Sequence, residues 1–269
     1  MTKKIAFFDI DGTLTSEIDG SIPESVKYAL ERSRDNGNLL FINTGRCMQN
    51  VEERFRILGF DGYLCGCGTN IYVEKDNQKK EILHVEQPHA VIMEVLKAVR
   101  SLKADILFES KYFVRFDTSR DFFTEGGYKQ YSHFVKKNYD MSQDIEASDF
   151  VCDKFVVWFE DIRDLATLRK VTDLHFECID RGGNFREFVP LGYSKATGIQ
   201  TVLDYYNIPL KNAFAFGDSN NDLAMLSYVP NSIAMGNSVP SSLFNQVSYV
   251  TSNASEDGIA KALEHFGFI

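Results

Sequence analysis

The stretch IAFFDIDGT, residues 5–13, decides the fold of this chain. Its first four residues are all apolar, and such a continuous run is typical of a strand that is buried on both faces. The run stops at Asp9, and a glycine-containing turn follows. A strand buried on both faces needs helices above and below it, so this stretch predicts a sheet that is covered by helices.

The residues that follow repeat the same pattern. Ile22, Val26 and Leu30 have helical spacing, Asn-Gly at 36–37 supplies a helix stop, and residues 39–42 form a second apolar run. A strand, a helix and a strand in succession predict parallel strands joined by a right-handed crossover.

The next part of the chain extends this sheet. The sequence predicts a helix over about 48–58 and a strand over 63–65. It then predicts a hairpin in which strands at 71–73 and 82–85 flank the polar stretch 74–80.

The character of the sequence changes near Pro88 and changes back near Pro190. Between these prolines we expect a separate α+β unit with helices near 92–99, 128–137 and 165–171, and strands near 106–108, 113–116, 155–159, 175–179 and 185–189. After it the alternation of strand and helix returns, with helices at 195–206, 221–226 and 259–266 and strands at 213–216, 232–234 and 247–250. The sequence therefore predicts an α/β fold, with a discontinuous core of residues 1–84 and 190–269 and an inserted α+β domain of residues 85–189.

Composition and net charge disfavour some classes of binding partner. The chain has 269 residues and a formal charge of -9 at pH 7, which disfavours nucleic acid and anionic membranes as partners. Its five cysteines are an odd number without zinc-site spacing, so we expect reduced thiols. Because no apolar run reaches the length of a membrane helix or a signal segment, we expect a cytoplasmic protein. Oligomeric state does not follow from the sequence.

Polar residues stand where three predicted strands end. Asp9 and Asp11 follow the first strand, Thr44-Gly45-Arg46 follows the second, and GDSNND at 217–222 ends a late strand. Ligands of open parallel sheets bind beyond the carboxyl ends of the strands. Each motif alone also fits turn chemistry or a helix N-terminus, but their shared position favours one site. Two aspartates at i and i+2 on the same side of the chain repel each other, so the site calls for a cation.

Lys195 stands at the start of the helix predicted at 195–206. With four motifs, DIDGT at 9–13, Thr44, Lys195 and GDSNND, the chain resembles the haloacid dehalogenase (HAD) superfamily of aspartyl-phosphate phosphohydrolases. The inserted region and the run EFVPLGYSK at 187–195 look like the Cof-like group with a type IIB cap. The resemblance implies a HAD-like Rossmannoid parallel-sheet core, with the inserted α+β domain as a cap that sets specificity.

The resemblance also implies roles for single residues. Asp9 would be the nucleophile and Asp11 the general acid/base, which argues for phosphate esters because family dehalogenases lack an acid there. Mg²⁺ would be held by Asp9, the backbone carbonyl of Asp11 and Asp218, with Asp222 in an outer position. The phosphate and substrate contacts implied are Gly12, Thr44, Gly45, Arg46, Lys195 and Asn221.

Some features keep two interpretations. Cys67 stands where many relatives have asparagine, and we favour a small turn residue over a reactive thiol. Arg46 fits a substrate anion or a helix cap equally well. In the inserted domain we favour a hairpin turn at 181–184 over a substrate contact. We also favour ordinary core packing for an aromatic cluster that consists of Phe122, Phe123, Tyr128, Tyr131 and Phe134.

The leading functional hypothesis is a Mg²⁺-dependent phosphatase of small phosphorylated metabolites, such as sugar phosphates, nucleotides or phosphorylated cofactors. One alternative is a phosphomutase, which uses the same nucleophile. Another is a non-catalytic phosphate-binding module that resembles a receiver domain, although receivers are about half as long and have no inserted domain.

Overall fold

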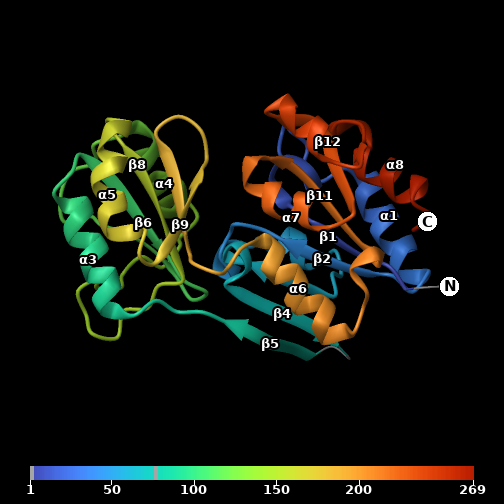
Figure 1. Ribbon diagram of the computed structural model, residues 1–269, viewed down its shortest axis with the longest axis horizontal. Helices are drawn as coiled ribbons and strands as arrows, with labels where there is room; N and C mark the ends of the chain where they lie inside the picture. The colour runs from blue at the N-terminus through green and yellow to red at the C-terminus, as the bar shows by residue number, and fades with distance from the viewer. Residues whose placement is uncertain (1–2, 76–77) are drawn as a thin grey trace. The chain divides into compact units, whose positions relative to one another are not determined.

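The computed structural model describes residues 3–75 and 78–269. It divides into two compact units, which Figure 1 shows with the second unit in green to yellow. The first unit takes its described residues from 1–46, 51–83 and 193–269, and the second from 47–50 and 84–192. The predicted fold class is confirmed, because the first unit holds a mainly parallel sheet between helices and the second an antiparallel sheet with helices.

The sheet of the first unit has eight strands within the described residues, in the order β13-β12-β11-β1-β2-β3-β4-β5. Their bounds are β1 Ile5–Phe8, β2 Leu39–Asn43, β3 Gly62–Cys65, β4 Asn70–Lys75, β5 Gln78–His84, β11 Ala213–Ser219, β12 Asn231–Val239 and β13 Tyr249–Val250. Strands β13 to β3 are parallel, and β4 runs antiparallel to β3. All four residues of β1 are fully buried, as expected for a central strand with helices on both sides.

Helices cover both faces of this sheet. Their bounds are α1 Glu24–Asp35, α2 Glu53–Arg56, α6 Lys195–Tyr206, α7 Leu223–Tyr228 and α8 Gly258–His265. Buried side chains of α6 and α7 pack on one face of the central strands. On the other face α1 and α8 lie side by side. Helices thus cover both faces of the sheet, and the polar residues of interest lie at the carboxyl ends of its strands.

The second unit is built on an antiparallel sheet in the order β7-β6-β8-β10-β9. Its elements are α3 His89–Arg100, β6 Ala104–Glu109, β7 Val114–Phe116, α4 Glu125–Lys136, β8 Lys154–Phe159, α5 Leu165–Thr172, β9 Phe176–Asp180 and β10 Phe185–Pro190. Helices α3 and α5 contribute to the apolar cluster on one face of this sheet, and Phe134 of α4 belongs to a smaller cluster on the other face.

One predicted helix is wrong. In place of a helix over about 48–58, the structure has a 3₁₀ turn at Met48–Asn50 and the single helical turn α2. Tertiary contacts break the helix between them. Val51 is buried, and Glu52 has an extended backbone while its carboxylate accepts hydrogen bonds from Arg46 and Arg54. Local periodicity did not reveal these contacts.

Some element boundaries also differ from the prediction. Strands β4 and β5 extend into the polar stretch that was predicted as a turn, and residues 76–77 lie outside the described residues. Helix α7 begins at Leu223 because a 3₁₀ turn at Asn220–Asp222 precedes it.

Candidate active site

The carboxyl ends of three adjacent parallel strands form the floor of the candidate site. Asp9 follows β1, Thr44 follows β2, and Asp218 is the second-last residue of β11. The ladder fixes the backbone at two of these positions, because the amide of Asp9 donates to the carbonyl of Phe216 at 3.0 Å and that of Thr44 to the carbonyl of Leu64 at 2.8 Å. Strand pairing therefore brings together residues that are far apart in the sequence.

Lys195 is placed by the start of α6. Ser194 caps this helix, and the side-chain amide of Asn43 donates to the backbone carbonyl of Lys195 at 3.0 Å. The ammonium of Lys195 donates to Oδ1 of Asp9 at 2.5 Å and to Oδ1 of Asp222 at 2.6 Å. With the Lys195 side chain only 1% exposed, both ion pairs are shielded from water.

Asp222 is tied to the turn after β11. Its Oδ2 accepts from the backbone amides of Asp218 at 2.9 Å and Ser219 at 3.1 Å. Gly217 is required for this approach, because a Cβ there would lie 2.6 Å from the Cβ of Asp222. Both oxygens of Asp222 are thus engaged, which suits a residue that orients its neighbours.

The turn after β1 approaches the same place. Gly12 has φ +75°, and a Cβ there would lie 2.5 Å from Oδ2 of Asp218. The hydroxyl of Thr13 donates to Oδ1 of Asp218 at 3.2 Å, and the side-chain amide of Asn237 donates to the carbonyl of Gly12 at 2.8 Å. The glycine thus allows the backbone to pass close to the Asp218 carboxylate.

Three carboxylates gather around one ammonium. Oxygen atoms of Asp9, Asp218 and Asp222 lie within 4.8 Å of one another. Burial raises the pKa of Asp9 to about 7, against the opposing effect of Lys195. Burial, with the charges of Asp222 and Asp9, raises the pKa of Asp218 to about 8. Although burial alone would lower the pKa of Lys195, Asp222 and Asp9 raise it above its usual range.

This donor set fits a divalent cation. Oδ2 of Asp9 and Oδ2 of Asp218 accept no hydrogen bond from any residue in the described ranges, although both residues are largely buried. Buried carboxylate oxygens in excess over cations are the ligands that Mg²⁺ prefers. Asp9 and Asp218 therefore fit direct contacts to the ion, and the fully engaged Asp222 fits an outer position.

The side chain of Asp11 takes a different direction. It is 64% exposed, and Arg46 binds both of its oxygens, through Nε at 3.0 Å and through Nη2. Arg46 also donates to Glu52 at 3.3 Å and lies over the ring of Phe55. Arg46 thus holds Asp11 in this structure, and both interpretations of Arg46, a contact to a substrate anion and a helix cap, stay predictions.

The remaining predicted residues lie close to this centre in sequence or in space. Thr44 is 1% exposed, and its hydroxyl accepts from the amide of Arg46 at 3.2 Å, across Gly45. Asn221 is largely buried and accepts from the hydroxyl of Ser219. Cys67 is buried at a left-handed turn with φ 57°, and its amide donates to the carbonyl of Thr44 at 3.0 Å. This geometry fits the turn residue that we favoured.

Two asparagines hold parts of the site, although the sequence had given neither of them a role. Asn43 holds the first turn of α6, and Asn237 holds both the Gly12 turn and the amide of Ala254, at 2.9 Å. Asn43 lies directly beside the Thr44 motif, so its place at a strand end was a usable signal. Asn237 stands in no recognised motif, and only the tertiary structure shows its role.

Comparison with known proteins agrees with the fold. The family model of haloacid dehalogenase-like hydrolases matches residues 6–263. A Streptococcus pyogenes protein named "Putative bifunctional phosphatase/peptidyl-prolyl cis-trans isomerase" is 29% identical over 268 residues, which cover 99% of this chain but 54% of that one. The chain thus spans about half the length of that relative.

Two further similarities cover nearly the whole length of both chains. The 5-amino-6-(5-phospho-D-ribitylamino)uracil phosphatase YitU of Bacillus subtilis is 25% identical over 283 aligned residues, covering 96% of this chain and 95% of that one. The solved HAD subclass IIB sugar phosphatase BT4131 superposes with a TM-score of 0.83 at 25% identity, covering 99% of this chain and 100% of that one.

The chain belongs to the haloacid dehalogenase-like hydrolases. Within that family it is a Cof-like member with the type IIB architecture, a hydrolase that acts on phosphate esters. Within residues 3–75 and 78–269, no helix has the length and apolar character needed to cross a membrane.

Proposed function

We propose that this protein is a Mg²⁺-dependent phosphatase of small phosphorylated metabolites that works through an aspartyl-phosphate on Asp9. The observation that carries the proposal is the buried network in which Lys195 bonds Asp9 and Asp222 while Asp218 lies beside them. It offers a nucleophile, a fixed cation and a set of metal ligands at one strand edge.

Asp9 is the proposed nucleophile. One of its carboxylate oxygens forms a bond to phosphorus while the bond from phosphorus to the ester oxygen breaks. Lys195 bonds the Asp9 carboxylate and counters the negative charge that would otherwise repel the phosphate. The buried backbone of Asp9 leaves this carboxylate little freedom, which favours attack from one direction.

Asp11 is the proposed general acid and base. Its protonated carboxyl gives a proton to the departing ester oxygen, and its carboxylate later takes a proton from the water that attacks phosphorus and frees Asp9. Arg46 holds both oxygens of the ionised form. We therefore assign Arg46 a positioning role toward Asp11, and the bidentate pair has to loosen when Asp11 carries the proton.

Mg²⁺ is the proposed cofactor, held by Asp9 and Asp218 with the backbone carbonyl of Asp11, and with Asp222 in an outer position. When bound, it supplies positive charge next to the phosphoryl oxygens. Thr44, Gly45 and Gly12 would add hydrogen-bond donors to the same oxygens, and Asn221 and Asp222 would orient the surrounding groups. Arg46 stays a proposed substrate contact in addition to its bond with Asp11.

The substrate is proposed only as a class. The superposed BT4131 is a sugar phosphatase, and YitU acts on a phosphorylated ribitylaminouracil. Both names place the phosphate on a sugar or on a sugar-alcohol chain, which supports a small phosphorylated metabolite here. The role of residues 85–189 as a specificity cap over a catalytic core of 1–84 and 190–269 is part of the same proposal, as is a cytoplasmic location.

The proposal is tested by measuring phosphate release from a panel of sugar phosphates, nucleotides and phosphorylated cofactors. Activity should need Mg²⁺, disappear with a chelator and return when Mg²⁺ is restored. Release that persists in the chelator, or isomerised product without free phosphate, would contradict it, and the second result would indicate a phosphomutase.

A further inference from the structure

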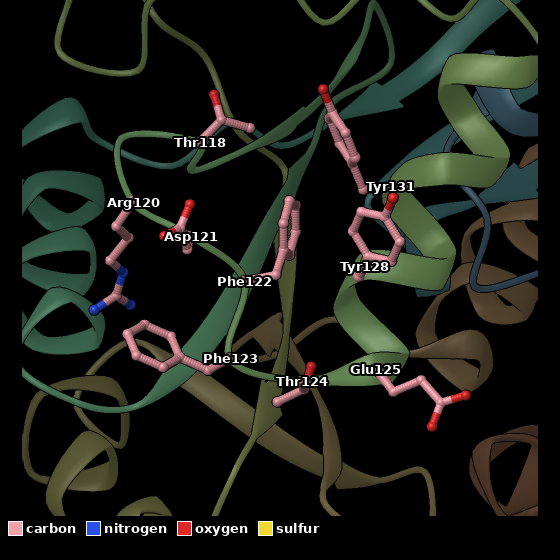
Figure 2. Close-up of a pocket in the computed structure, with 9 residues that line it drawn as sticks. All are labelled: Thr118, Arg120, Asp121, Phe122, Phe123, Thr124, Glu125, Tyr128 and Tyr131. Atoms are coloured by element: carbon pink, nitrogen blue, oxygen red, sulfur yellow. The ribbon is translucent and has the colours of Figure 1, made fainter.

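A cavity lies wholly within the second unit. Its volume is about 550 Å³, and its lining comes from the loop after β7 and the first turns of α4 (Figure 2). This volume is in the range of small-molecule sites. All of its lining residues fall between Thr118 and Tyr131, so the cavity is a feature of a single unit.

Aromatic rings form one wall of the cavity. Figure 2 shows Phe122 at the centre of the lining residues, with Tyr128 and Tyr131 on one side and Asp121 on the other. The ring of Phe122 lies 5.1 Å from that of Tyr131 and 5.8 Å from that of Tyr128. Tyr128 is 58% exposed, so part of this aromatic wall faces solvent. The expectation that the whole cluster is core packing does not hold for Tyr128 or for Phe123, which is 37% exposed.

The aromatic wall is built on a rigid backbone. Asp105 accepts from the amides of Phe123 at 3.0 Å and Thr124 at 2.9 Å. Thr124 in turn caps α4 by accepting from the amide of Gly127 at 3.0 Å. These bonds fix the backbone directly after Phe122, so a ligand would not need to order this part of the loop on binding.

The charged groups of the cavity disfavour anions. Arg120 is its one basic lining residue, and its guanidinium already donates to four backbone carbonyls, at 2.6 to 3.0 Å. Asp121 and Glu125 supply carboxylates to the same lining. A phosphate or carboxylate ligand would therefore meet two carboxylates and a guanidinium whose Nη1 and Nη2 donors are already engaged.

We propose that this cavity binds a planar nitrogen heterocycle, uncharged or cationic, stacked on the aromatic wall of Phe122, Tyr128 and Tyr131. Aromatic faces attract planar rings and organic cations, and the phenol hydroxyls can bond ring nitrogen and oxygen atoms. This site is additional to the phosphatase site and does not depend on it.

The test uses riboflavin as the probe, because its fused ring is planar and uncharged and it carries no phosphate. Quenching of riboflavin fluorescence by the full-length protein should give a saturable affinity. Tyr128→Ala should weaken it by about tenfold or more, as expected for loss of a stacking ring. Tyr112→Ala is the matched control, because Tyr112 lies in the same unit, is 57% exposed and is not part of the cavity lining.

The charge preference is tested by displacement of riboflavin with three compounds that share a pyridine ring. 1-Methylnicotinamide and nicotinamide should displace it better than the anion nicotinate. Circular dichroism and the Tm of each variant show that it is folded. No saturable quenching, equal affinity in wild type and Tyr128→Ala, or strongest displacement by nicotinate would overturn the proposal.

Discussion

Each unit of this protein buries one lysine among carboxylates, and the two clusters differ in their balance of charge. In the first unit Lys195 bonds Asp9 and Asp222, and Asp218 lies beside them. Asp9 and Asp218 each keep one carboxylate oxygen that accepts no hydrogen bond among the described residues. In the second unit Lys154, 2% exposed, bonds Glu109 of β6 and Glu187 of β10, the two strands that flank its own strand β8. Arg181 lies 3.7 Å from Glu187 and adds a second positive charge.

The difference separates a reactive site from a structural one. The cluster of the second unit is balanced, with two basic and two acidic side chains, and can hold its strands together without a further ion. Burial, together with the excess negative charge of the first cluster, raises the pKa values of Asp9 and Asp218, and the unbalanced charge calls for a cation. Both clusters are buried, so the balance of charge is what distinguishes the candidate active site.

The largest expected effect comes from removing the nucleophile. Asp9→Asn should lower kcat by at least about 10⁴-fold, as loss of a covalent nucleophile does in other enzymes. Steady-state phosphate release measures it. Glu109→Gln, which changes a buried carboxylate of the balanced cluster, should leave kcat within a few-fold of wild type. Equal losses in both variants would contradict the division of roles.

Asp11→Asn should lower kcat by about 10²–10⁴-fold, because it removes the acid and base of both half-reactions. Its carboxylate is 64% exposed, so the change should alter the free energy of unfolding by about 1 kcal/mol or less. Kinetics and denaturant unfolding of the same sample separate the two effects. A large loss of stability with little loss of activity would show that the Arg46–Asp11 pair is structural.

Lys154→Met should lower the free energy of unfolding by about 3–5 kcal/mol, because it leaves two buried glutamates without their shared ammonium. Urea unfolding measures the loss. Lys103→Met is the control, because Lys103 pairs with Glu160 at 3.1 Å but is 67% exposed, and it should cost about 1 kcal/mol or less. Similar losses of unfolding free energy in the two variants would contradict the shielding of the Lys154 ion pairs from water.

A further expected effect is the response of stability to pH and Mg²⁺. The pKa values of Asp9 and Asp218 without metal, about 7 and about 8, lie above the usual value of an unfolded aspartate, so the folded state retains protons that the unfolded state loses. Without Mg²⁺, the free energy of unfolding should fall between pH 5 and 8, by roughly 1 kcal/mol per pH unit for each carboxyl.

Mg²⁺ should counteract this fall, since it binds the ionised carboxylates of the folded state, and at about 100 times its Kd it adds about 2.7 kcal/mol. Urea unfolding at pH 6 and pH 8, with chelator or with Mg²⁺, measures both effects. Asp218→Asn should reduce the pH slope and the Mg²⁺ response together. A stability that rises toward pH 8 in chelator would contradict the assignment of these carboxyls.

The parts of the fold that were predictable have a strong local signal. The run at 5–8 and the strand ends at Asp9, Thr44 and Asp218 could be predicted because buried parallel strands are continuously apolar and end in polar turns. The helix expected over 48–58 failed because Val51 and Glu52 follow tertiary contacts. The pairing of Arg46 with Asp11 and the role of Asn237 also depend on residues far apart in the chain, which no local pattern encodes.

The most direct test of the account is to trap the aspartyl-phosphate. The Asp11→Asn variant should be mixed with Mg²⁺ and ³²P-labelled 4-nitrophenyl phosphate, whose leaving group needs little protonation, and quenched in acid within one turnover. We predict acid-stable label on the peptide that contains Asp9, and none in the Asp9→Asn, Asp11→Asn double variant. Release of phosphate by the single variant without protein-bound label at any time point, or label on another residue, would contradict the account.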